Sequence, residues 1–197
     1  MHPEARHFLD FVRRHLAARF RGDVLDVGSG DINGTNRGYF PTETCRYTGC
    51  DLVAGPNVDV VSPCHELPFG PASFDVVISS ECLEHDMHWR KTVGKIVEMV
   101  RPGGLFVMTC ATTGRAEHGT LRTRAGDSFS TMLGDDEAWQ NYYGNLTEED
   151  LRGVVAVEDT FSWARFHVNT ASRDLYFAGV KRGGDEAVPD VPEYACA

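Results

Sequence analysis

The sequence lacks any long apolar run. A membrane-spanning helix needs about 20 consecutive apolar residues, and no hydrophobic stretch of this 197-residue chain comes close to that length. The hydrophobic region of a secretory signal is also missing from the N-terminal segment, because charge enters it at Glu4, Arg6, Asp10, Arg13 and Arg14. We therefore expect a cytoplasmic protein with no membrane partner.

Cysteine pairs of the kind that bind metals or form redox centres are missing as well. The six cysteines include no Cys-x-x-Cys pair and no spacing typical of a metal site. Free thiols in apolar segments behave as small hydrophobic side chains. We expect reduced cysteines and assign no metal site.

Basic residues are few. Lys and Arg number 19 against 29 Asp and Glu, which gives a formal net charge of −10. Proteins that hold a phosphate backbone usually carry a basic patch, whereas the basic stretch at residues 115–124 contains only three arginines. Nucleic acid is therefore a disfavoured partner, and a small-molecule partner is favoured.

What the chain does contain is a regular alternation of apolar runs with helical or irregular connections. A single domain is expected over residues 1–182, with helices at residues 3–20 and 89–100. The expected strands are residues 23–27, 47–52, 58–61, 74–79, 105–109, 154–159, 161–168 and 175–181. This alternation predicts a mainly parallel sheet that is covered on both faces and binds ligands at the carboxyl ends of its strands.

Two segments depart from this pattern. Periodicity disappears over residues 111–146, and an aperiodic stretch of that length is uncommon unless it forms a lid or an acceptor-binding insertion. Thr147 to Asp150 has the spacing of a capping box and predicts the start of a short helix. The tail at residues 183–197, with two prolines and several acids, is expected to be mobile.

The most informative motif is a glycine turn at the end of the first expected strand. It reads Asp26-Val-Gly28-Ser29-Gly30, and its glycines let the backbone approach a ligand closely. Asn33 stands where a dinucleotide fingerprint has its third glycine, which disfavours a nicotinamide dehydrogenase. The carboxylate of Asp26 suits an ammonium group, whereas it would repel a pyrophosphate.

A second acid completes the pattern at the end of the second expected strand. Asp51 lies 23 residues after Gly28 and can accept hydrogen bonds from two ribose hydroxyls, each contributing about 1.5–3 kcal/mol. A nucleoside joined to an amino-acid ammonium group describes S-adenosylmethionine. The alternative interpretation is that Asp26 and Asp51 only cap turns.

The stretch from Val24 to Thr109 resembles the methyltransferase-domain family called type 11. The matching motifs are Val24-Leu-Asp-Val-Gly-Ser-Gly30, Tyr47-Thr-Gly-Cys-Asp-Leu52, His65-Glu-Leu-Pro-Phe69, Ser73-Phe-Asp-Val-Val-Ile-Ser-Ser-Glu-Cys-Leu-Glu-His85 and Met99-Val-Arg-Pro-Gly-Gly104. The resemblance implies a class I S-adenosylmethionine-dependent methyltransferase over residues 1–182. It also implies an α/β, Rossmann-like, doubly wound seven-stranded sheet of order 3-2-1-4-5-7-6. The last strand would be antiparallel, and the insertion would follow the fifth strand.

The same resemblance assigns the residues that hold S-adenosylmethionine. They are Asp26, Gly28, Ser29, Gly30, Asp51, Leu52, Cys64, His65 and Ser80. One position departs from the family pattern, because Pro63 stands where similar proteins have an acid that binds the adenine amino group. The backbone amides of Cys64 and His65 remain available to the adenine ring, and Ser62 and His65 are candidates to replace the missing acid.

Residues after the fourth and fifth strands are the catalytic candidates, because in this fold they lie near the reactive methyl group. Glu81 and His85 follow the fourth strand, and His118 follows the fifth. His118 is best suited to take a proton near neutral pH; the alternative is a solvated loop histidine. For His85, the alternative to catalysis is a structural role or a role on the cofactor side of the site.

The function expected from these features is methyl transfer to an oxygen or nitrogen atom of a small-molecule or glycan-like metabolite. Two alternatives stay open. The acceptor is a protein or RNA, or the chain is a non-catalytic partner subunit that binds S-adenosylmethionine. An open, acceptor-sized pocket beside the cofactor site would favour catalysis, and a plugged site would favour the binding subunit.

Overall fold

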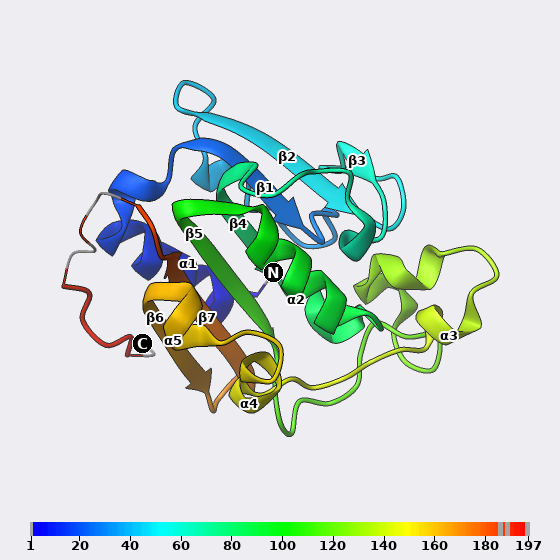
Figure 1. The fold of residues 1–197 in the computed structure, drawn as a ribbon. Coiled ribbons are helices and arrows are strands. Elements are labelled where there is room, and N and C mark those ends of the chain that lie inside the picture. Colours follow the sequence, from blue (N-terminus) through cyan, green and yellow to red (C-terminus); the bar gives the residue numbers. More distant parts are fainter. Residues whose placement is uncertain (1, 185–186, 188–189, 196–197) are drawn as a thin grey trace.

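The computed structural model describes residues 2–184, 187 and 190–195, which form one seven-stranded sheet with helices on both faces (Figure 1). The strands are β1 (Gly22–Val27), β2 (Cys45–Asp51), β3 (Val60–Val61), β4 (Phe74–Ser80), β5 (Val100–Ala111), β6 (Phe161–Asn169) and β7 (Asp174–Lys181). Their order is β3-β2-β1-β4-β5-β7-β6, and β7 runs antiparallel to both of its neighbours. The expected fold class and strand order are confirmed.

The longest helices of the described residues are α1 and α2. The α-helices are α1 (Pro3–His15), α2 (Trp89–Met99), α3 (Glu137–Gln140), α4 (Glu148–Arg152) and α5 (Val157–Thr160). Single 3-10 turns are η1 (Ala17–Arg19), η2 (Arg37–Tyr39), η3 (Cys64–Glu66), η4 (Leu83–His85), η5 (Ala125–Asp127) and η6 (Phe129–Met132). No helix in the described ranges is long and apolar enough to cross a membrane.

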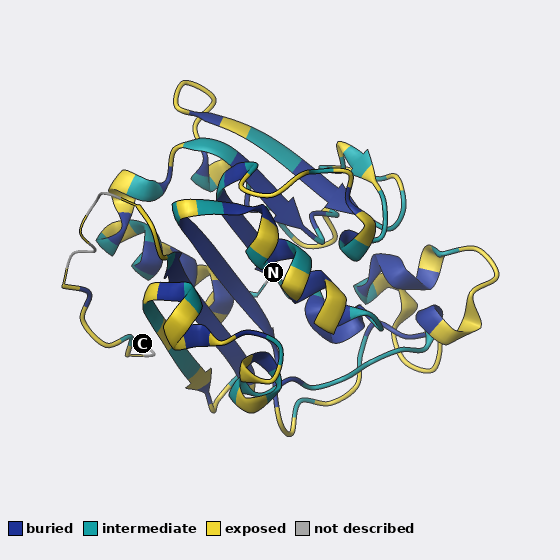
Figure 2. Cartoon of the chain, viewed as in Figure 1, coloured by how far each residue is buried: buried dark blue, intermediate teal, exposed yellow. Residues whose placement is uncertain are grey.

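The sheet separates two hydrophobic clusters, because successive residues of a strand point to opposite faces. In β5, Leu105 packs in the cluster with α1, whereas Phe106 packs in the cluster with α2. Leu9 of α1 and Ile96 of α2 are fully buried, and each buried side chain of this kind contributes about 1.5–3 kcal/mol. Figure 2 shows the central strands buried over most of their length, with their more exposed residues near the strand ends. The rigid sheet therefore fixes where its carboxyl ends lie.

One strand expectation is wrong. Residues 154–159 contain α5 instead of a strand, with the amides of Asp159 and Thr160 donating to the carbonyl of Ala156. Val155 and Val157 still enter the core beside α2. A short apolar run fits a buried helical turn as well as a strand, because periodicity alone does not separate the two.

The insertion at residues 111–146 projects beyond the carboxyl ends of the parallel strands and contains η5, η6 and α3 (Figure 1). It ends at α4, where Thr147 and Asp150 form the expected capping box. In the segment expected to be mobile, Val191 is buried and the Tyr194 ring packs on Phe8 and Phe11 of α1. Residues 185–186, 188–189 and 196–197 of that segment lie outside the described residues.

Candidate active site

A cavity of about 500 Å³ lies at the carboxyl ends of β1, β2 and β4, with the insertion forming part of its wall. Nearly all the site residues that were predicted from the sequence line this cavity. The predicted residues that line it are Asp26, Gly28, Ser29, Gly30, Asp51, Leu52, Cys64, Ser80, Glu81, His85 and His118. Residues expected to bind the cofactor and residues expected to act on an acceptor therefore face one space.

The glycine turn is shaped by two close contacts. Gly28 has φ +76°, and a Cβ there would stand 2.2 Å from Sγ of Cys82. A Cβ on Gly30 would stand 2.3 Å from the ring of Phe129, which belongs to the insertion. Glycine is needed at both positions, at Gly28 also because its backbone conformation is one that other residues rarely adopt.

Asp26 is held in place at the bottom of the turn. It is 1% exposed, and both of its carboxylate oxygens lie 3.1 Å from the Nδ2 donor of Asn36. The Tyr47 hydroxyl donates to the same carboxylate. Burial raises the pKa of Asp26 to about 6, so a positively charged ligand nearby would favour its ionised form.

Asp51 is oriented by backbone amides at the end of β2. It is 8% exposed and accepts from the amides of Gly30 at 2.9 Å and Leu52 at 2.8 Å. Burial raises the pKa of this carboxyl. Each carboxylate oxygen has two lone-pair sites, so both oxygens can still accept a hydroxyl from a ligand in the cavity.

His65 does not line this cavity. The residue lies in η3, and its ring packs on His88 with a centroid distance of 4.5 Å and on Trp139 at 6.3 Å. The hydroxyl of Ser62 donates to the carbonyl of Pro63 at 3.0 Å. Cys64 does line the cavity, and so does Trp139, which brings an aromatic surface from the insertion to this end.

Glu81 stands at a strained position directly after β4. Its φ is +53°, a value that non-glycine residues seldom adopt and that tends to occur at functional sites. Its amide donates to the carbonyl of Thr109 at 2.8 Å. Oε2 lies 3.1 Å from Nε2 of His2, which also lies 3.0 Å from Asp174. The N-terminal segment is thereby tied to the cavity wall.

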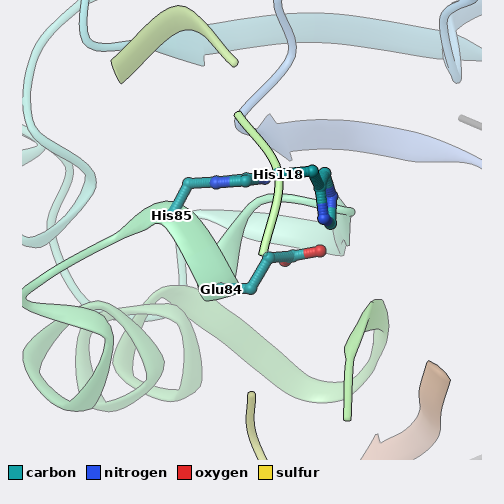
Figure 3. Close-up of side chains that lie close together, drawn as sticks. All are labelled: Glu84, His85 and His118. Carbon is teal, nitrogen blue, oxygen red and sulfur yellow. The ribbon is translucent and has the colours of Figure 1, made fainter. Parts of the chain in front are cut away.

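Three further side chains converge next to this position. One potential ligand atom each from Glu84, His85 and His118 lies within 4.8 Å of the others (Figure 3). Glu84 and His85 are buried on η4, and half-buried His118 comes from the insertion. Burial and the neighbouring His118 lower the pKa of His85 to about 3, so His85 is neutral at physiological pH.

Sequence reasoning missed Asn36, Phe129 and His2. Asn36 orients Asp26 and also bonds Ser80 at 3.3 Å, but an isolated asparagine in a loop has no distinguishing pattern. Phe129 lies in the aperiodic insertion, and His2 reaches the cavity only because α1 packs across the sheet. These residues reach the site through contacts between segments that are distant in the chain. The spacing of residues within one segment does not reveal such contacts.

Comparison with known proteins agrees with this geometry. Residues 25–108 match a family model described as a methyltransferase domain. The phthiotriol/phenolphthiotriol dimycocerosates methyltransferase of Mycobacterium tuberculosis is 34% identical over 95 residues. That match covers 42% of this chain and 35% of the relative, so it spans about a third of the relative's length.

Solved structures share the fold at lower identity. The 1,6-didemethyltoxoflavin-N1-methyltransferase of Burkholderia thailandensis, solved with S-adenosylhomocysteine, has a TM-score of 0.61 and 22% identity. That match covers 92% of this chain and 79% of the other. The phosphoethanolamine N-methyltransferase 2 of Haemonchus contortus, in complex with S-adenosylmethionine, has a TM-score of 0.62 and 19% identity. That match covers 90% of this chain and 53% of the other. These similarities establish the fold.

We predict that Gly28→Ala destabilises the protein by about 2–5 kcal/mol. A left-handed backbone costs a non-glycine residue roughly 1–2 kcal/mol, and overpacking against Cys82 adds about 1–3 kcal/mol. The measurement is urea unfolding. Gly38→Ala is the matched control, because a Cβ at position 38 would meet no atom within 4 Å. Equal stabilities for the two variants would contradict the close approach.

Proposed function

We propose that this chain, which carries a methyltransferase domain of the class I fold, transfers a methyl group from S-adenosylmethionine to a small-molecule or glycan-like metabolite. The acceptor atom is an oxygen or a nitrogen. The observation that carries the proposal is the shared cavity, in which Asp26, Gly28 and Asp51 face the same space as His85 and His118. A donor and an acceptor bound there would lie side by side.

The cofactor half of the cavity suits the groups of S-adenosylmethionine. Asp51 offers carboxylate oxygens for the ribose hydroxyls, and the Gly28 turn allows the chain to pass closely. Asp26 is a buried acid without a cationic side chain among its hydrogen-bond partners, Asn36 and Tyr47. An ammonium group would supply the missing positive charge.

The acceptor half supports an enzyme over a non-catalytic binding subunit. The cavity of about 500 Å³ lies within the range of about 300–1,000 Å³ that is usual for small-molecule sites. It is open beside the cofactor turn and lined there by Glu81, His85 and His118. With a formal net charge of −10, a small acceptor is favoured over RNA.

The reaction would be a direct displacement. A lone pair of the acceptor attacks the methyl carbon, the carbon–sulfur bond breaks, and its electron pair remains on sulfur to give S-adenosylhomocysteine. The acceptor loses one proton. Because the sulfonium is already activated, positioning supplies much of the acceleration, and we propose that His118, with His85 and Glu81, activates the acceptor.

The insertion at residues 111–146 is proposed to act as a lid. The ring of Phe129 lies against Gly30 and Gly55, where built Cβ atoms would approach it to 2.3 and 2.7 Å. Ser128, Phe129 and Ser130 line the cavity. The insertion therefore packs on the glycine turn beside the cavity, and we expect it to move locally when a ligand enters.

The first prediction concerns the cofactor. We expect micromolar binding of S-adenosylhomocysteine by calorimetry and much weaker binding of NAD. Asp51→Ala removes two charge-assisted hydrogen bonds, nominally about 3–6 kcal/mol, which water partly offsets. Glu43→Ala, which removes the same charge from an exposed turn residue, should leave the affinity unchanged. A loss of less than about threefold in Asp51→Ala would show that Asp51 does not bind the ribose.

The second prediction concerns the acceptor. Once a methyl-acceptor screen has identified a substrate, His118→Ala should lower turnover by about 10²–10⁴-fold, with nearly unchanged affinity for S-adenosylhomocysteine. His7→Ala, an exposed histidine on α1, is the matched control. Because His85 is buried, His85→Ala should also lower stability. Near-normal turnover of folded His118→Ala would remove His118 from the mechanism.

The third prediction concerns the lid. Arg122 and Arg124 are exposed in the insertion, so trypsin should cut there faster in the free protein than in the presence of S-adenosylhomocysteine and acceptor. Cleavage sites outside residues 111–146 serve as internal controls. Equal rates at Arg122 and Arg124 in both states would remove the reason to regard this segment as a lid.

A further inference from the structure

We propose that Glu84, His85 and His118 bind one divalent transition-metal ion at the acceptor side of the cavity. The three side chains offer one carboxylate oxygen and two imidazole nitrogens within 4.8 Å of one another (Figure 3). Ligand atoms that bind one ion at about 2.0–2.2 Å lie roughly 3–4 Å apart. A small adjustment of these side chains is enough to close the site.

The polar atoms of this cluster are unsatisfied. Oε2 of Glu84, Nδ1 of His85 and the hydroxyl of Tyr143 are buried and have no hydrogen-bond partner among the described residues. Glu84 is 0% exposed and His85 is 6% exposed. Buried polar groups in native proteins are nearly always paired, so three unpaired ones around one point indicate a missing ligand. The Tyr143 ring lies edge-on to His118 at a centroid distance of 5.0 Å and tilted to His85 at 5.6 Å.

The surroundings orient two of the ligands. Oε1 of Glu84 accepts from the amide of Ala111 at 3.1 Å, which leaves Oε2 for the ion. Nδ1 of His118 lies 3.1 Å from the carbonyl oxygen of Ala116. Because a carbonyl only accepts, this contact places a proton on Nδ1, and in the neutral ring Nε2 then keeps its lone pair. Metal-binding histidines are commonly oriented by such a bond from the other ring nitrogen.

Gly119 makes room for the second imidazole. A Cβ at position 119 would stand 2.7 Å from Cε1 of His85, and Gly119 has φ +60°. The residue directly after His118 therefore packs against His85 and brings the two rings to a centroid distance of 5.0 Å. This contact joins the insertion to η4 at the proposed ion.

A neighbouring cluster serves as a contrast. His2, Glu81 and Asp174 also lie close together, but Nε2 of His2 already contacts both carboxylates at 3.1 and 3.0 Å. Its hydrogen bonds to Asp174 and Glu81 outweigh burial and raise the pKa of His2 to about 10. A protonated imidazole has no lone pair for a metal. In this cluster two carboxylates already engage the imidazole, although Oε1 of Glu81 has no hydrogen-bond partner among the described residues. At Glu84 neither the free carboxylate oxygen nor Nδ1 of His85 has a partner there.

The donor set defines the class of ion. Two imidazoles and one carboxylate suit Zn²⁺, Mn²⁺, Fe²⁺ or Co²⁺, whereas Ca²⁺ and Mg²⁺ prefer oxygen ligands. Three protein ligands also leave coordination positions open, as in catalytic metal sites. His85 and His118 line the cavity, so an open position would face the acceptor.

This inference rests on the proposed function for its chemical role. An ion bound there would hold an acceptor hydroxyl and lower its pKa, so that the proton leaves to water as the oxygen attacks the methyl carbon. His118 would then be a metal ligand instead of the proton acceptor expected from the sequence. The sequence-based expectation of no metal site depended on spacing, and α2 and β5 separate His118 from Glu84 and His85 in the chain.

The test begins with protein stripped by a chelator and measures binding of Mn²⁺ and Zn²⁺ by calorimetry, without acceptor. Co²⁺ gives a second readout through its visible absorption. We expect one ion per chain and at least tenfold weaker binding in His118→Ala and Glu84→Gln. His118 is half-buried, so His118→Ala should fold even if Glu84→Gln does not. His7→Ala is the histidine control, and its affinity should match that of the unsubstituted protein.

Two outcomes would overturn the inference: no saturable binding near one ion per chain, or unchanged affinity in His118→Ala. Binding that is lost in His2→Ala but kept in His118→Ala would assign the ion to the other cluster and would also overturn it. A separate titration with S-adenosylhomocysteine tests the proposed function independently of metal binding. A protein that binds S-adenosylhomocysteine but no metal refutes only this inference, and one that binds metal but no S-adenosylhomocysteine refutes the proposed function.

Discussion

The close approach between the turn after β1 and the loop after β4 determines where everything else in the site lies. Gly28 leaves no room for a Cβ because Cys82 occupies that volume. As a result, the glycine turn and the segment from Glu81 to His85 form adjoining walls of one cavity. A close-packed interior transmits small changes in volume, so the spacing of these two cavity walls depends on the contact between Gly28 and Cys82.

Buried acids give the cavity its electrostatic character. Asp26, Asp51 and Glu84 are each less than a tenth exposed, and burial raises the pKa of all three. Burial of an unpaired charge is costly, so burial shifts each of these three acids toward its protonated form. A cationic ligand favours the ionised form of a neighbouring acid. Near pH 6, where Asp26 titrates, binding of an ammonium group and release of a proton are therefore linked.

The features that were predicted correctly from sequence are those that short segments of the chain specify. The glycine turn, the acids at the ends of β1 and β2, and the capping box at Thr147 all depend on residues close in the chain. Residues 154–159 were misassigned because Val155 and Val157 can be buried by either a strand or a helical turn. Asn36, Phe129 and His2 were missed because their roles arise from packing between distant segments.

The cluster of Glu84, His85 and His118 shows why a metal site of this kind is hidden in the sequence. Adjacent residues of a regular helix or strand point in different directions, but Glu84 and His85 lie together on the single turn η4, from which both reach the same point. The third ligand arrives from the insertion, positioned by the contact of Gly119 with the His85 ring. The turn η4, the path of the insertion and the backbone conformation of Gly119 must together place the three side chains at one point. A rule based on sequence spacing detects none of these three features. The unpaired atoms of Glu84 and His85 make the site visible, because a fold that buries such groups must supply them with a partner.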